Sequence, residues 1–153
     1  MLEAVWITGM ATGTTVQPSC TRFSVPAELK AVRDVRRRVG DFARAHGFGS
    51  EEVETIQTAV GEAALNGIKH GSPHGSSDSV FVSCRYDSEG ITIEVADTGT
   101  GFDPDSVPTP VAENFRSCGY GVSLMRGLMD DVTFNRYDDG TTVRLFKRLS
   151  HPH

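Results

Sequence analysis

The sequence predicts an α+β domain, a two-layer α/β sandwich with a mostly antiparallel mixed sheet and its helices on one face. Three observations support this prediction. The periodic segments follow the order β-α-α-β-β-loop-α-β-β, tight turns join consecutive strands, and the first two helical segments each carry one apolar stripe. Strands joined by tight turns pair antiparallel, and a helix with one apolar stripe covers a sheet from one side. With 153 residues, the chain is long enough for one such domain.

The first half of the chain predicts a short strand followed by two helices. Residues 1–19 lack a sustained period and are expected to form a flexible arm before a domain at 20–149. The run CTRFSV, residues 20–25, predicts a strand. Apolar residues at spacings of three and four then indicate a helix: Leu29, Val32, Val35, Val39 and Phe42. Ser50 is expected to cap a second helix to about Lys69. Its predicted buried stripe is Val53, Ile56, Val60, Ala64 and Ile68.

The second half predicts two hairpins separated by a long loop and a third helix. The elements follow in order: strands at 80–86 and 91–96, a loop at 97–118, a helix at 120–129, strands at 132–137 and 141–149, and a tail at 150–153. Loops as long as this one usually have a functional reason. The predicted sheet core consists of Phe81, Val82, Ile91, Ile93, Val95, Val143 and Leu145.

Composition and charge exclude several classes of protein. A net charge of -5 argues against nonspecific nucleic-acid binding, which needs a basic surface. No run approaches the roughly 18 apolar residues of a membrane span. The three cysteines form no CxxC motif, which disfavours a disulfide framework or a cysteine zinc site. No Lys or Arg precedes Arg22, which is wrong for a secretory signal, so we expect a cytoplasmic protein without direct contact to nucleic acid or membrane.

The second predicted helix carries a first candidate site. Glu62, Asn66 and His70 are spaced by four residues, so their side chains share one helix face. An Asn carbonyl gives Mg²⁺ a hard oxygen ligand, and a Glu can polarise a hydroxyl or a water. The spacing therefore indicates a magnesium-nucleotide site. The alternative is an ordinary solvated face, because polar residues recur in this way on most amphipathic helices.

A second candidate site follows the strand at 91–96. Asp97 closes an apolar strand, and Gly99 and Gly101 allow the backbone to turn sharply and to approach a ligand closely. An Asp in this position can accept a hydrogen bond from an exocyclic amine such as that of adenine. A glycine-rich strand exit without function is the alternative.

A third candidate site precedes the last predicted helix. Gly119 and Gly121 stand where free backbone amides at a helix start would bind an anion, and glycines let a phosphate come close. Arg116, just upstream, could reach a terminal phosphate, or it is simply solvated. No Lys-Ser/Thr follows, so this is not a Walker A loop.

Together, the segments EAALNGIKH, DTGTGF and GYGVSLMRGLMD resemble the N, G1 and G2 boxes of the GHKL ATPase superfamily. The closing LMD most resembles the anti-sigma factor serine/threonine kinases. The resemblance covers about residues 20–149 and implies the Bergerat fold, in agreement with the element order. It implies that Glu62 is the catalytic carboxylate, Asn66 the Mg²⁺ ligand and Asp97 the residue that recognises adenine. The other implied ATP contacts are Gly99, Gly101, Arg116, Gly119, Tyr120, Gly121, Val122 and Thr141.

Two positions depart from that family pattern. Tyr120 stands where the serine kinases often have Arg, and Val122 replaces their usual Leu. The first departure affects one phosphate or partner contact, and the second is conservative.

The resemblance implies an ATP- and Mg²⁺-dependent protein serine kinase. Its implied partners are a STAS-type anti-sigma antagonist, which it phosphorylates, and a sigma factor; a homodimer is a further expectation. The alternatives are a non-catalytic nucleotide-binding module, a histidine-kinase-like domain acting in trans, or a metal module through His70 and His74. Residues 22–46 carry seven Lys or Arg against three Asp or Glu. These basic residues are either a solvated helix face or a docking surface for an acidic partner.

Overall fold

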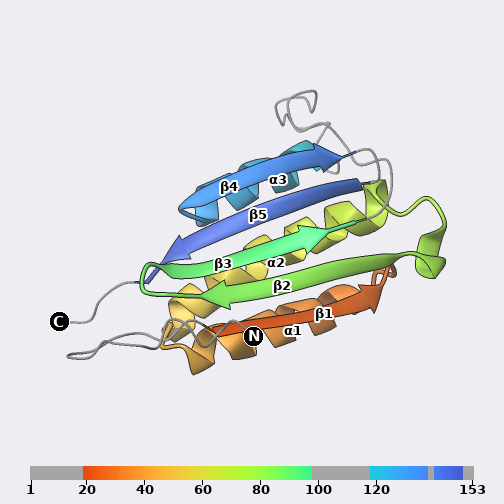
Figure 1. Cartoon of the computed structure of the whole chain (residues 1–153). Coiled ribbons are helices and arrows are strands. Elements are labelled where there is room, and N and C mark those ends of the chain that lie inside the picture. The colour runs from red at the N-terminus through yellow and green to blue at the C-terminus, as the bar shows by residue number, and fades with distance from the viewer. Residues whose placement is uncertain (1–18, 98–117, 138–139, 150–153) are drawn as a thin grey trace.

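The computed structural model describes residues 19–97, 118–137 and 140–149. Within them the elements are, in chain order, β1 (Ser19–Pro26), α1 (Ala31–Ala45), α2 (Ser50–His70), β2 (Ser79–Tyr86), β3 (Gly90–Ala96), α3 (Cys118–Leu128), β4 (Asp131–Tyr137) and β5 (Gly140–Arg148). A short 3₁₀ turn lies between α2 and β2. The helices lie behind the sheet in Figure 1, which confirms the predicted α+β sandwich with helices on one face.

The five strands of the described residues form one sheet in the order β1-β2-β3-β5-β4. Every neighbouring pair is antiparallel. The register places Val82 opposite Val95, and Val95 opposite Val143, so these side chains share the face that the helices cover. Their neighbours Glu94 and Thr142 belong to the other face, which we call the open face.

The core lies between the covered face of the sheet and the apolar stripes of the helices. Val35 and Val39 of α1 and Ile56 and Val60 of α2 are fully buried, as their spacing predicted. α1 ends at a turn where Gly47 has φ +94°, a conformation that favours glycine. None of the described helices is long and apolar enough to cross a membrane.

Four local predictions were wrong or shifted. Leu29 is 61% exposed because α1 begins only at Ala31, so Leu29 is not on the helix stripe. Phe81 is 47% exposed because its register with Ala96 places it on the open face. The residue that precedes α2 is Gly49 instead of Ser50, and the Gly49 N–H donates to the side chain of Glu52 at 3.3 Å.

The last shift concerns α3, which begins two residues earlier than predicted, at Cys118. Gly119 and Gly121 therefore lie inside the first turn of the helix and do not precede it. The expected arm up to residue 18, nearly all of the long loop and the tail at 150–153 lie outside the described residues.

The strand order brings three distant segments together. Because β5 lies between β3 and β4, the end of β3 meets the beginning of β5, where Ala96 pairs with Thr142. α2 contacts both α1 and α3 and also packs on β3 and β5. The C-terminal half of α2, the end of β3 and the start of β5 can therefore contribute to one site (Figure 1).

Candidate active site

Glu62 and Asn66 lie one helical turn apart on α2, opposite the first turn of α3. Glu62 is partly buried, whereas Asn66 is only 4% exposed. A Cβ placed on Gly121 would lie 2.7 Å from Glu62 Oε1 and 3.9 Å from Asn66 Nδ2. The structure thus brings three of the predicted site residues, Glu62, Asn66 and Gly121, into direct proximity.

Two buried polar atoms in this region have no hydrogen-bond partner among the described residues. They are Nδ2 of Asn66 and Oγ1 of Thr141, and Thr141 is 1% exposed. A buried polar group without a partner costs about 1–3 kcal/mol, so native structures rarely keep one without a reason. Both positions were predicted to contact a bound nucleotide, and a ligand that supplies the absent hydrogen bonds would remove this cost.

Asp97 and Thr141 form a reciprocal pair at the junction of β3 and β5. The Asp97 N–H donates to the Thr141 carbonyl at 3.0 Å, and the Thr141 N–H donates to Asp97 Oδ1 at 3.2 Å. These hydrogen bonds hold the Asp97 carboxylate against the backbone of the buried Thr141. The structure thus places Thr141, one of the implied ATP contacts, in direct contact with Asp97, the residue that the resemblance assigns to adenine.

Two glycines near the end of α2, Gly67 and the C-cap residue Gly71, lie beside Asp97, and neither was among the predicted site residues. Only Gly71 must lack a side chain to leave room for the Asp97 carboxylate. A Cβ on Gly67 would lie 3.7 Å from Asp97 Cβ, which is ordinary contact, whereas a Cβ on Gly71 would overlap the Asp97 carboxylate. The Gly71 N–H donates to the Gly67 carbonyl at 3.0 Å, and the Ser72 hydroxyl donates to the same carbonyl at 2.9 Å. The sequence carries one signal for this pair. Gly67 directly follows Asn66, and Gly71 lies four residues later, so the two glycines stack on one face at the end of the helix.

The first turn of α3 contains Gly119, Tyr120 and Gly121. The backbone amides at the start of a helix lack intrahelical acceptors and lie at its positive end, which suits an anion. Val122 is 5% exposed and packs in the core, so its side chain has a structural role. Any contact of Val122 with a nucleotide would come from its backbone. The remaining predicted contacts, Gly99, Gly101 and Arg116, lie outside the described residues.

The two histidines of the alternative metal module differ in their surroundings. His70 ends α2, and partial burial together with Lys69 lowers its pKa below 6.5. The His74 N–H donates to Asp78 Oδ2 at 2.7 Å, and its ring lies 3.4 Å from Asp78 Oδ1, so His74 shapes the turn. The part of the chain that the structure describes contains no group of three metal-ligating side chains.

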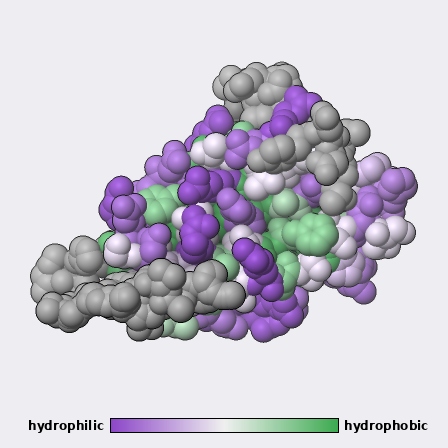
Figure 2. All heavy atoms as spheres, in the orientation of Figure 1, coloured by the Kyte–Doolittle hydropathy of each residue, from purple (hydrophilic) through white to green (hydrophobic). Residues whose placement is uncertain are grey.

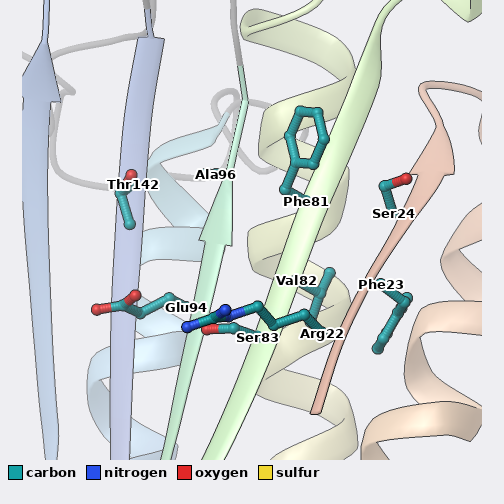
Figure 3. Close-up of a pocket in the computed structure, with 9 residues that line it drawn as sticks. All are labelled: Arg22, Phe23, Ser24, Phe81, Val82, Ser83, Glu94, Ala96 and Thr142. Atoms are coloured by element: carbon teal, nitrogen blue, oxygen red, sulfur yellow. The ribbon is translucent and has the colours of Figure 1, made fainter. Parts of the chain in front are cut away.

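A separate hollow of about 380 Å³ lies on the open face of the sheet. Figure 3 shows the residues that line it: Arg22, Phe23, Ser24, Phe81, Val82, Ser83, Glu94, Ala96 and Thr142. Figure 2 shows this side of the molecule, with a hydrophobic patch bordered by hydrophilic surface. The hollow is distinct from the cluster around Glu62, which lies on the helix side of the sheet.

Comparison with known families identifies the class of protein. The histidine kinase-like ATPase domain family matches residues 25–147, and the chain belongs to this family. Within it, the chain is similar to the serine-protein kinase RsbW of Oceanobacillus iheyensis, with 30% identity over 119 residues that cover 72% of this chain and 75% of the relative. The RsbW of Listeria innocua is 29% identical over 134 residues and covers 82% of this chain and 85% of the relative. These similarities confirm the predicted resemblance and support the predicted enzyme class, a protein serine/threonine kinase.

Two solved structures share the fold. The first, of the RsbU and RsbW domains of Rv1364c from Mycobacterium tuberculosis, has a TM-score of 0.67 at 20% identity and covers 88% of this chain. The present chain spans only 33% of that longer one. The second is the histidine kinase domain of a blue-light activated histidine kinase from Erythrobacter litoralis, with a TM-score of 0.52 at 16% identity, covering 91% of this chain and 70% of that one.

Proposed function

We propose that this protein is an ATP-dependent protein serine kinase of the anti-sigma type, which phosphorylates a small STAS-type antagonist and holds a sigma factor inactive. The observation that carries the proposal is the buried Asn66 Nδ2, which has no hydrogen-bond partner among the described residues and lies one helical turn from Glu62, opposite α3. A ligand that offers a hydrogen-bond acceptor to this N–H donor, such as a phosphate oxygen, is bound favourably. The similarity to serine-protein kinases supports the same assignment.

The residues present fit a magnesium nucleotide. We assign Asp97 to accept a hydrogen bond from the exocyclic amine of adenine, with its carboxylate held by the Thr141 N–H. Asn66 offers an amide oxygen of the kind that Mg²⁺ binds, and the ion would neutralise charge on the phosphates when bound. The amide of Gly119, in the first turn of α3, would contribute to holding a phosphate.

Glu62 is suited to accept the proton of the substrate serine. Within the described residues no hydrogen bond to its carboxylate is present, so its lone pairs can receive a substrate hydroxyl. In the proposed reaction the serine oxygen forms a bond to the γ-phosphorus, and the bond from that phosphorus to the β–γ bridging oxygen breaks. Glu62 takes the hydroxyl proton and ADP leaves, while positioning supplies much of the rate enhancement.

The basic surface of α1 is the proposed docking site for an acidic protein partner. A hollow of about 560 Å³ runs along it, lined by Val32, Arg33, Arg36, Arg37, Asp41, Arg44 and Gln57. Arg37 and Arg44 are partly neutralised, because both form ion pairs with Asp41. Arg33 and Arg36 form no ion pair with any described residue, so their charge is available to a partner. The antagonist and the sigma factor are the candidate partners.

A phosphotransfer assay tests the kinase assignment. Wild-type protein is incubated with ATP labelled at the γ-phosphate, Mg²⁺ and a STAS-type antagonist. We expect an acid-stable phosphoserine on the antagonist and its loss in Glu62→Ala, with ATP binding retained. A wild-type protein that binds ATP without transfer would favour the non-catalytic module, and an acid-labile product would favour the histidine-kinase-like domain.

Charge reversal tests the docking surface. Arg33→Glu is expected to weaken the complex with an acidic partner at least about tenfold, because a like-charge contact replaces an attractive one. Its affinity for ATP should not change. Lys30→Glu is the matched control, since Lys30 is 84% exposed and lies outside the hollow. Equal effects of the two variants would contradict a specific docking site.

The homodimer stays a prediction, and sedimentation equilibrium of the purified protein measures its oligomeric state.

A further inference from the structure

Gly121 packs against the carboxylate that the proposed reaction uses. It is buried in the first turn of α3, and a Cβ at this position would approach Glu62 Oε1 to 2.7 Å. Real Cβ atoms essentially never come this close to another heavy atom, so a side chain on Gly121 requires something to move. The next atoms are farther away, with Glu62 Cδ at 3.7 Å and Asn66 Nδ2 at 3.9 Å. The conflict therefore concerns one carboxylate oxygen.

This requirement for glycine is specific to one end of α3. A Cβ on Gly127, near the other end of the same helix, would meet no heavy atom of the described residues within 4 Å. Both glycines weaken the helix to a similar degree, because glycine loses more backbone entropy than alanine. Of the two, Gly121 alone has a neighbour that explains its lack of a side chain.

We propose that Gly121 is a positioning residue that leaves room for the Glu62 carboxylate to receive the proton of the substrate serine. The proposal rests on the proposed kinase function and adds a role to the phosphate contact expected for Gly121. An added methyl group would push the carboxylate aside and leave the helices in place, because Oε1 is the far end of a flexible side chain. The helix itself gains from alanine. Stability and catalysis should therefore change in opposite directions.

The expected result for Gly121→Ala is a folded protein whose thermal stability equals or exceeds that of the wild type. Its KM for ATP should stay within about twofold, whereas kcat for antagonist phosphorylation should fall about 10- to 100-fold, since a displacement near 1 Å of a catalytic group has effects of this size. If Gly121 acted only through a phosphate contact, Gly121→Ala would raise KM for ATP. If Gly121 acted only in packing, the substitution would lower the thermal stability.

The decisive experiment combines this variant with Glu62→Asp, whose shorter side chain withdraws the carboxylate from the space beside Gly121. Single-turnover phosphotransfer and thermal unfolding are measured for both single variants and the double variant, with Gly127→Ala as the control. We expect Gly121→Ala to lower the rate less than about twofold in the Glu62→Asp background, and Gly127→Ala to leave the rate unchanged.

Three results would overturn the positioning role: an unfolded Gly121→Ala chain, an unchanged kcat, or an equal loss in both backgrounds. A wild-type protein without any transfer would instead contradict the proposed function, so the two failures are distinguishable.

Discussion

Thr141→Val is expected to stabilise the nucleotide-free protein and to weaken nucleotide binding. The Thr141 hydroxyl is buried and has no partner among the described residues, while its backbone N–H donates to Asp97. Valine has nearly the same shape and replaces the hydroxyl with a methyl group. The substitution therefore removes the cost of the unpaired hydroxyl and leaves the backbone contact to Asp97 in place.

The magnitudes follow from the burial of this hydroxyl. An unpaired buried polar group costs about 1–3 kcal/mol, so the free energy of unfolding should rise by up to this amount. At this chain length each kcal/mol raises Tm by roughly 2–4 °C. A hydrogen bond from the hydroxyl to bound nucleotide contributes about 0.5–1.5 kcal/mol, so its loss should weaken nucleotide binding about 2- to 13-fold.

Urea unfolding without nucleotide and calorimetric titration with ADP and Mg²⁺ measure the two effects of Thr141→Val. Thr142→Val is the matched control, because Thr142 belongs to the open face of the sheet and lines the hollow there, away from Asp97 and Glu62. The control should change stability by less than about 0.5 kcal/mol and leave affinity unchanged. A Thr141→Val protein that is less stable and binds nucleotide as tightly as the wild type would refute the reasoning.

Two further substitutions have distinct expected outcomes. Gly71→Ala should lower ATP affinity at least about tenfold in calorimetry, because its Cβ would overlap the Asp97 carboxylate, and hydrogen bonds to charged groups contribute about 1.5–3 kcal/mol. Gly67→Ala is the control, because its Cβ meets only ordinary contacts and should leave the ATP affinity unchanged. Equal ATP affinities of the two variants would contradict the proposed role of Gly71. Burial, and to a smaller extent Cys20, raise the pKa of the Cys84 thiol to about 12 from 9.0. The unfolded chain therefore loses this proton first, and the Cys84 contribution to the free energy of unfolding should fall by about 1.4 kcal/mol per pH unit between these values. Urea unfolding of the wild type and Cys84→Ala should show this difference in slope, and parallel slopes would count against it.

The sequence predicted the elements well because their apolar spacing depends on local geometry. Val35 and Val39 are buried at the expected positions of α1. Leu29 continues the same spacing, but the helix does not extend to it, and spacing alone does not locate a helix end. Phe81 lies between two apolar neighbours, Val80 and Val82, so alternation could not decide which face it occupies. Pairing with β1 and β3 decides it.

The proximity of candidate site residues was predictable where they share one helix and unpredictable where the sheet topology brings them together. Glu62 and Asn66 follow from a spacing of four on α2. The contact of Asp97 with Thr141 joins residues 44 positions apart, and it exists because β5 inserts between β3 and β4. Gly71 acquires its importance from the same arrangement, because Asp97 approaches it only in the folded sheet.

The most direct test of the magnesium-nucleotide site is ATP affinity measured with and without Mg²⁺ for the wild type, Asn66→Ala and Asp97→Ala. Asp97→Ala should lose at least about tenfold in affinity under both conditions, because its proposed contact is with adenine. Asn66→Ala should lose more affinity when Mg²⁺ is present than when it is absent, because its amide oxygen is the proposed Mg²⁺ ligand. Unchanged affinity in both variants would contradict the assignment of this cluster as the nucleotide site.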